Sequence, residues 1–209
     1  MATTSPVSDR PHKAARRYIY AWGDGSAEGD GGMKDLLGGK GAGLAEMTKA
    51  GLPTPPGFTI TTAACNDYFD AGEQLPAGLW EDVLEAVKAV EASAGKGFGD
   101  PKNPLLLSVR SGAKFSMPGM MNTVLDIGLN NDTIGGLIAL SGNERFAWDS
   151  YHRLVHMFGD TVLQVPDELF EEAIDEAKAA KGTDSDLDLG AGDMKALTLK
   201  YKEIVADHI

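Results

Sequence analysis

The sequence has little of three features that would mark a secreted, a membrane or a nucleic-acid-binding protein. Its 209 residues include one cysteine, Cys65, so no internal disulfide can form and a reducing compartment, the cytoplasm, is expected. No stretch approaches the ~18–20 apolar residues needed to cross a membrane. Lys and Arg number 19 against 31 Asp and Glu, and the net charge of −12 opposes binding to a phosphate backbone. We therefore expect neither a membrane nor nucleic acid among its partners.

The N-terminal segment, residues 1–16, contains basic and polar residues but no apolar block after them. This excludes a secretory signal. Its Ser, Thr and Arg content loosely resembles an organelle transit peptide, but the segment is short. A disordered tail is the favoured interpretation.

The remaining sequence predicts mixed helix and strand followed by helices alone. Strands are predicted at residues 17–22, 58–60 and 105–109, a flexible connector at 23–32, and helices at 41–49, 62–70, 79–93, 133–140, 143–158, 166–181 and 193–207. The 105–109 strand is expected to be buried, and Leu44, Met47 and Ala50 to form the apolar side of the first helix. The change in character predicts an α/β (α+β) fold with one subdomain over residues 17–129 and a small all-helical subdomain over 130–209. The last helix has no stop signal, which predicts that the natural chain continues.

A glycine-rich segment, residues 38–43, is the first candidate for a phosphate site. It is not a P-loop, because position 34 is Lys and position 41 is Gly, and the spacing of its glycines does not fit the dinucleotide fingerprint. Glycines nevertheless let backbone N–H groups approach an anion, a helix follows, and Lys40 adds a mobile cation. The alternative is a turn with Lys40 as a solvated surface charge.

Two further segments could contact the same ligand. Arg110 directly follows the predicted 105–109 strand, and its planar guanidinium suits phosphate oxygens. A structural arginine paired with a carboxylate is an equal alternative. Residues 116–123 are rich in Met and Gly, which favours an adaptable surface that closes on a ligand, although Met residues filling a core would give the same composition.

Paired histidines are the main candidate for a metal site. His152 and His156 lie four residues apart, which is the spacing of helical metal ligands. No carboxylate follows in the metalloprotease pattern, and the segment is amphipathic. We predict no metal-binding residue in this chain.

Three longer strings together resemble one family. They are LLGGKGAGLAEMTKAGLPTPPGFTITTAAC, PLLLSVRSGAKFSMPGMMNTVLDIGLN and RFAWDSYHRLVHMFGDTVL, and they are similar to the N-terminal region of pyruvate, phosphate dikinases. The resemblance covers the chain from about Tyr18 to its end. It implies the first subdomain of an ATP-grasp-like nucleotide-binding domain.

The resemblance also implies an activity and a set of site residues. The family converts ATP, phosphate and pyruvate into AMP, pyrophosphate and phosphoenolpyruvate through a phosphohistidine. Lys40 and Arg110 match its phosphate-positioning residues, so they are expected to act in catalysis. The predicted ATP-contacting set is Gly39, Lys40, Gly41, Arg110, Gly119, Met120, Met121 and Thr123. ATP and Mg²⁺ are the implied cofactors, with the Mg²⁺ ligands expected outside this chain.

The resemblance leaves alternatives open. Asn122 stands where family members often carry Asp, which removes a charge from the closing loop. The phosphohistidine domain, the pyruvate site and the adenine pocket are expected beyond this chain, in C-terminal domains of an enzyme that is a homo-oligomer. A segment of phosphoenolpyruvate synthase ranks second, and a truncated, non-catalytic nucleotide-binding or docking module is the third possibility.

Overall fold

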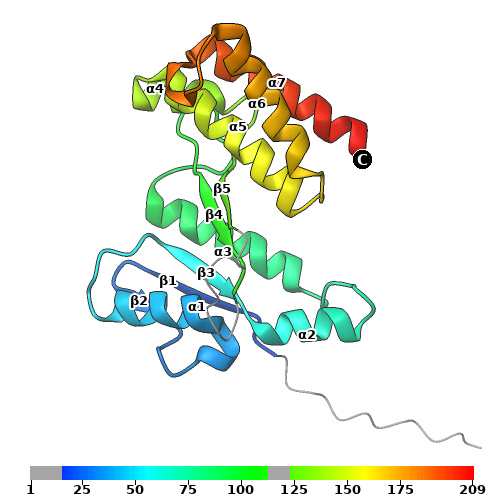
Figure 1. Cartoon of the computed structure of the whole chain (residues 1–209). Coiled ribbons are helices and arrows are strands. Elements are labelled where there is room, and N and C mark those ends of the chain that lie inside the picture. The colour runs from blue at the N-terminus through cyan, green and yellow to red at the C-terminus, as the bar shows by residue number, and fades with distance from the viewer. Residues whose placement is uncertain (1–15, 113–122) are drawn as a thin grey trace, which may run out of the picture.

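The computed structural model of the protein describes residues 16–112 and 123–209 (Figure 1). A small part built of helices and strands comes first, and a helical part follows it, which confirms the mixed fold class. The predicted N-terminal tail lies, apart from Arg16, outside the described residues.

The first sheet contains three antiparallel strands in the order β2-β1-β3. Their bounds are β1 Ile19–Gly23, β2 Ser26–Ala27 and β3 Gly57–Ile60. Ile19 of β1 pairs with Ile60 of β3, and Trp22 pairs with Gly57. The predicted strands at 17–22 and 58–60 are thus neighbours in one sheet.

The prediction of a flexible connector over residues 23–32 was wrong. Asp24 and Gly25 take φ angles of 50° and 75°, as a two-residue hairpin turn requires, and β2 folds back on β1. The Glu28 carboxylate then accepts a hydrogen bond from the Ala21 N–H at 2.7 Å. The Asp-Gly pair was the local signal for this hairpin.

Three helices accompany this sheet: α1 Lys34–Lys49, α2 Thr62–Asp70 and α3 Leu79–Ala94. Helices α1 and α3 both pack against the sheet. Helix α2 begins as predicted, since the Thr61 hydroxyl accepts a hydrogen bond from the Ala64 N–H. Leu79 and Val90 of α3 are buried, and Val83 and Val87 are half-buried.

The apolar side predicted for α1 was wrong. Met47 is exposed, and the buried residues are Leu37, Gly38, Gly41, Ala42, Ala45 and Thr48. The reason is a close approach: a Cβ atom on Gly41 would lie 2.5 Å from the Thr59 Oγ1 atom of β3. At Gly41 there is no room for a side chain between this helix and the sheet.

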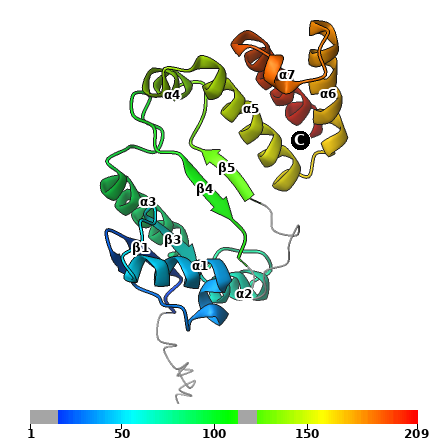
Figure 2. The ribbon, with the colours of Figure 1, turned by 60° about the vertical axis from the view of Figure 1, so that its left-hand side comes forward.

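A two-stranded antiparallel ribbon of β4 (Leu107–Arg110) and β5 (Thr123–Ile127) follows. Figures 1 and 2 show it between the α/β part and the helical part. The prediction of a buried strand over 105–109 was wrong: Leu105 is buried, but Val109 is 55% exposed. Among the described residues β4 has a single neighbouring strand, so the ribbon cannot cover its apolar side chains as a larger sheet would.

All four helices predicted for the C-terminal part are present. They are α4 Ile134–Ser141, α5 Glu144–Thr161, α6 Asp167–Lys181 and α7 Ala191–His208, with a short 3₁₀ helix, Asp186–Asp188, before α7. Their shared core also includes Val124 of β5 and Leu129, both of which precede Asn130. The subdomain division at residue 130 stays a prediction.

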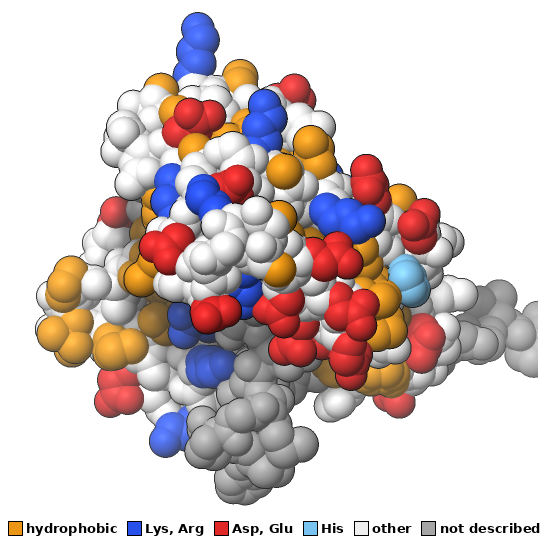
Figure 3. All heavy atoms as spheres, turned by 45° about the horizontal axis from the view of Figure 1, so that its top comes forward, with side chains coloured by type: hydrophobic (Ala, Val, Ile, Leu, Met, Phe, Trp, Pro, Cys, Tyr) orange, Lys and Arg blue, Asp and Glu red, His pale blue; other side chains and the backbone are white. Residues whose placement is uncertain are grey.

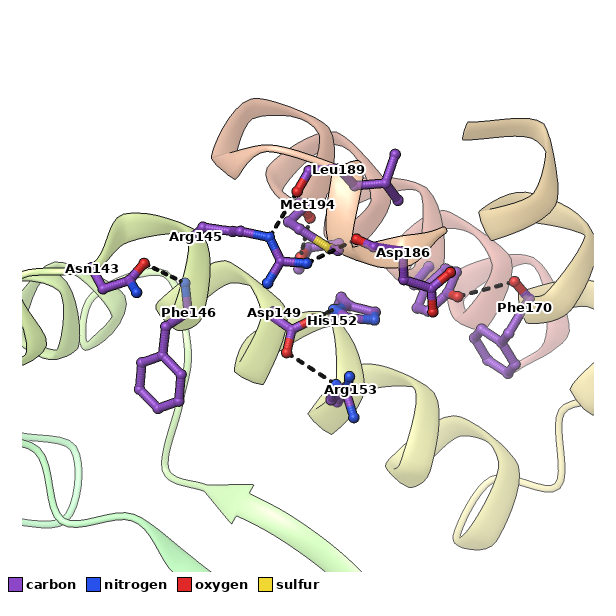
Figure 4. A network of polar contacts seen from close by, with 12 residues as sticks. Asn143, Arg145, Phe146, Asp149, His152, Arg153, Phe170, Asp186, Leu189 and Met194 are labelled. Atoms are coloured by element: carbon purple, nitrogen blue, oxygen red, sulfur yellow. Dashed lines mark hydrogen bonds and ion pairs between the residues drawn. The ribbon is translucent and has the colours of Figure 1, made fainter. Parts of the chain in front are cut away.

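The core of the helical part is centred on Phe170. This side chain is 0% exposed, its ring centroid lies 5.0 Å from that of Tyr201, and a Cβ atom on Gly159 would lie 2.7 Å from it. The Tyr201 hydroxyl donates a hydrogen bond to the Phe170 carbonyl at 3.0 Å (Figure 4). Phe170 therefore joins α5, α6 and α7 in one cluster.

We predict that Phe170→Ala lowers the free energy of unfolding by about 3–5 kcal/mol, because truncating a buried Phe leaves a cavity. Urea unfolding followed by circular dichroism measures this change. Phe146→Ala is the matched control, since Phe146 is 47% exposed. Equal losses in the two variants would contradict the assignment of Phe170 to the core.

His152 of α5 is also buried in the helical part, beside Tyr201. Its ring lies 5.7 Å from the Tyr201 ring, and its Nδ1 atom lies 3.8 Å from an Asp149 carboxylate oxygen that is too distant for a hydrogen bond (Figure 4). Burial lowers the pKa of His152, and this outweighs the opposing effect of Asp149. The unfolded chain therefore takes up the proton first, and neutral His152 favours the folded state above about pH 6.5, the ordinary pKa of histidine.

We predict that the folded state loses stability as the pH falls below about 6.5, through protonation of His152 in the unfolded chain. In His152→Gln, which cannot titrate, the dependence of unfolding free energy on pH should be flatter between pH 5 and pH 7. Urea unfolding at several pH values tests this. A variant whose pH dependence matches that of the wild type would rule out His152 as the source.

Candidate functional site

The glycine-rich segment lies inside α1, at a break in the helix. Gly38 has φ 69° and ψ 169°, so a new helical segment begins after it, with Gly39, Lys40 and Gly41 in its first turn. The prediction that a helix follows the glycine loop is thus correct, although a short helical segment also precedes it. The first N–H groups of a helical segment lack acceptors within that segment and carry partial positive charge, which suits an anion.

Lys40 reaches across to the end of the β4 strand. Its Nζ atom donates a hydrogen bond to the Ser111 carbonyl at 3.4 Å, which links two segments 71 positions apart in the sequence. The Lys40 side chain is half-buried. The structure therefore brings the glycine-rich segment, residues 38–43, next to residues 109–111 at the end of β4.

Arg110 is the last residue of β4 and is exposed. It pairs with Thr123, the first residue of β5, in the antiparallel ladder. Directly opposed residues in such a ladder have their side chains on one face. Lys40, Arg110 and Thr123 of the predicted set therefore lie near the end of the ribbon that Arg110 and Thr123 form.

Three other predicted site residues, Gly119, Met120 and Met121, lie outside the described residues. Asn122 lies there as well. The closing role expected of this Met- and Gly-rich loop stays a prediction.

The grouped residues can stabilise negative charge. A helix start and the Lys40 ammonium lie beside the strand end that carries Arg110, and these groups have N–H donors suited to phosphate oxygens. No group of three or more His, Cys, Asp or Glu side chains gathers anywhere in the described parts of the chain. The site is thus suited to phosphate oxygens but supplies no cluster of ligands for Mg²⁺.

The histidine pair shows protein contacts of its own. His156 Nε2 contacts the Asp167 carboxylate of α6, and its ring stacks 4.7 Å from that of Phe170. Arg145, further back on α5, donates hydrogen bonds to the Leu189 and Asp186 carbonyls at 2.8 Å each (Figure 4). These contacts join α5 to α6 and to the segment before α7.

The sequence interpretation missed two residues of this site. Ser111 contributes a backbone carbonyl, for which no sequence signal exists. Ser108 accepts a hydrogen bond from the Arg110 Nε atom at 3.4 Å. Strand periodicity could have identified it, because side chains two residues apart in a strand share a face.

Comparison with known proteins relates the segment that carries α1 to one family model. The family model described as "Pyruvate phosphate dikinase, AMP/ATP-binding domain" matches residues 34–77, which include the broken helix α1. Lys40 lies within that match, whereas Arg110 lies beyond it.

Several plant proteins are similar over nearly the whole chain. Pyruvate, phosphate dikinase 1, chloroplastic, from Arabidopsis thaliana is 52% identical over 203 residues, covering 97% of this chain and 21% of that protein. Pyruvate, phosphate dikinase 2 from Zea mays is 52% identical over 201 residues, covering 96% of this chain and 23% of that protein. The chloroplastic dikinase of Flaveria pringlei is 48% identical over 206 residues, covering 99% and 21%.

The chain spans about a fifth of the length of these curated relatives. The family-model match names a nucleotide-binding domain, and the identity extends over both the α/β part and the helical part. These findings relate this chain, over nearly all of its length, to a nucleotide-binding segment of the pyruvate, phosphate dikinases.

Proposed function

We propose that this chain supplies phosphate contacts for ATP in a pyruvate, phosphate dikinase. The observation that carries the proposal is the contact of Lys40 with Ser111, which brings the helix start at Gly39 and the arginine at position 110 to one place. The complete enzyme would convert ATP, phosphate and pyruvate into AMP, pyrophosphate and phosphoenolpyruvate through a phosphohistidine. This chain would be a fragment of that phosphotransferase, inactive alone, in which Lys40 and Arg110 position the phosphate.

Each proposed site residue has a role that its chemistry supports. The N–H groups of Gly39 and Gly41 face the phosphate oxygens at the helix start, and Lys40 adds a mobile charge. Arg110 provides two-pronged contacts, and Gly119, Met120, Met121 and Thr123 close over the nucleotide. Phosphoryl transfer relies on such positioning and on cations that offset charge on the transferred group.

The rest of an ATP-grasp architecture would come from outside this chain. The described residues offer no cluster that could hold Mg²⁺, so its ligands are proposed to lie in the C-terminal domains. Those domains would also complete the adenine pocket and form the homo-oligomer.

Two alternatives were open, and the relatives reported above favour neither. Each of these relatives is a dikinase, so a segment of phosphoenolpyruvate synthase ranks second. A non-catalytic docking module would also keep this fold. It differs in that phosphate binding at Lys40 and Arg110 would be dispensable.

The proposed partners exclude nucleic acid and membranes. Acidic and basic side chains are interspersed over the face seen in Figure 3, a distribution unlike the basic stripe of a nucleic-acid-binding surface. None of the described helices is long and apolar enough to span a bilayer. We propose the cytoplasm as the location, and the chloroplastic relatives make a plastid the competing location.

We predict that the chain binds inorganic tripolyphosphate and ATP at this site but does not bind adenosine. Titrations followed by amide NMR should shift the signals of Gly39, Lys40 and Gly41. Lys40→Ala or Arg110→Ala should weaken tripolyphosphate binding about 10- to 100-fold, the effect of one charge-assisted hydrogen bond. Arg110→Lys should also weaken it, because an ammonium lacks the two-pronged geometry.

The matched control for this titration is Lys34→Ala, an exposed lysine in the first helical segment of α1, before the break. It should leave binding within about twofold of the wild type. Absence of tripolyphosphate binding by the wild-type chain, or equal effects of all three lysine and arginine truncations, would refute the proposed site.

We also predict that the isolated chain neither consumes pyruvate nor releases phosphate from ATP, because phosphohistidine, pyruvate site and metal ligands are proposed to lie elsewhere. Coupled assays with Mg²⁺ and ATP should stay at background. Turnover by the purified chain that is lost in Arg110→Ala would show instead that the fragment is an enzyme by itself.

A further inference from the structure

The guanidinium group of Arg110 has a neighbour on its own strand. Ser108 lies two residues earlier in β4, so both side chains are on one face of the ribbon. The Arg110 Nε–H group donates a hydrogen bond to the Ser108 hydroxyl oxygen at 3.4 Å. Ser108 thus accepts the Nε–H donor and leaves the two terminal nitrogens of the guanidinium for other contacts.

This contact determines which donors stay available. A guanidinium group carries five N–H donors in a rigid plane, one on Nε and four on the two terminal nitrogens. With Nε–H directed to Ser108, the terminal nitrogens form the edge that can meet a phosphate in a two-pronged way. Without Ser108, the flexible side chain could rotate this edge away.

The backbone beside Ser108 is irregular. Leu107 pairs with Ile127 and Val109 pairs with Val124, so Ser108 alone faces two residues of β5. One of these two, Asp126, has a φ of 59°, in the left-handed region. Such a bulge increases the twist of a ribbon and often redirects a side chain next to a functional site.

The following residue ties this end of the ribbon to α1. The Ser111 carbonyl accepts the Lys40 ammonium, so the strand that carries Ser108 and Arg110 ends beside the helix start. The hydrogen bond to Ser108 and the contact of the Ser111 carbonyl with Lys40 thus lie on either side of Arg110 in the chain.

We infer that Ser108 is a positioning residue for phosphate binding: its hydroxyl accepts the Arg110 Nε–H and turns the terminal nitrogens toward the phosphate that Lys40 also contacts. This inference rests on the proposed ATP-phosphate site. It adds a residue that acts through Arg110 and does not itself touch the ligand.

The test is a double-mutant cycle on the 209-residue chain, with inorganic tripolyphosphate as the probe. Ser108→Ala should weaken binding about 5- to 10-fold, the effect of one net hydrogen bond. Ser108→Thr keeps the hydroxyl and suits a strand, so its binding should stay within about twofold of the wild type. In the Arg110→Ala background, Ser108→Ala should cause no further loss, because the two residues act as a unit.

A second readout follows the contact without ligand. The NMR signal of the Arg110 Nε–H should shift and exchange faster with water in Ser108→Ala and should be retained in Ser108→Thr. Ser26→Ala is the matched control, since Ser26 is another exposed strand serine, distant in the sequence from Arg110. It should change neither binding nor this signal.

The outcomes separate this inference from the proposed function. Loss of binding in Arg110→Ala with none in Ser108→Ala would overturn the positioning role and leave the phosphate site intact. Equal losses in Ser108→Ala and Ser108→Thr, or a further loss in the double variant, would also overturn it. No effect of Arg110→Ala would refute the phosphate site itself, and the inference with it.

Discussion

The pairing of β4 with β5 is the constraint on which the rest of the structure depends. One end of this ribbon carries Arg110 and leads to the Ser111 carbonyl, which accepts the Lys40 ammonium. Its other strand contributes Val124, which is buried in the core of the helical part. The position of Arg110 relative to Lys40 therefore depends on a ladder that is anchored in the helices. A change in the register of β4 and β5 would shift Arg110.

A close approach at Gly41 holds the glycine-rich segment of α1 against the sheet. Helix α1 approaches β3 at Gly41, at a distance from Thr59 that leaves no room for a Cβ atom. The positive φ of Gly38 allows a helix start to form in the middle of this helix. Gly38 and Gly41 thus serve backbone geometry and packing, and the contact proposed with an anion comes in addition.

The helical part differs in its physics, because large side chains dominate its interior. Phe170 and Tyr201 interlock edge to face, and the Tyr201 hydroxyl reaches the Phe170 carbonyl. Burial raises the pKa of the tyrosine hydroxyl, which stays a hydrogen-bond donor throughout the physiological range. A rigid cluster of this kind gives the ribbon a fixed support, so the stability of the helices and the geometry of the site are linked through β5.

The sequence by itself predicted the helices and three of the strands, because helical periodicity, glycine terminators and the Thr61 cap are local signals, whereas β2 and β5 were not predicted. It also singled out Lys40 and Arg110 by their side-chain chemistry, while their contact with phosphate stays a prediction. Burial and proximity were decided by tertiary structure alone. The exposure of Val109, the small-residue side of α1 and the contact of Lys40 with Ser111 depend on which segments meet in space. No local pattern encodes such meetings, since they arise from the packing of residues far apart in the chain.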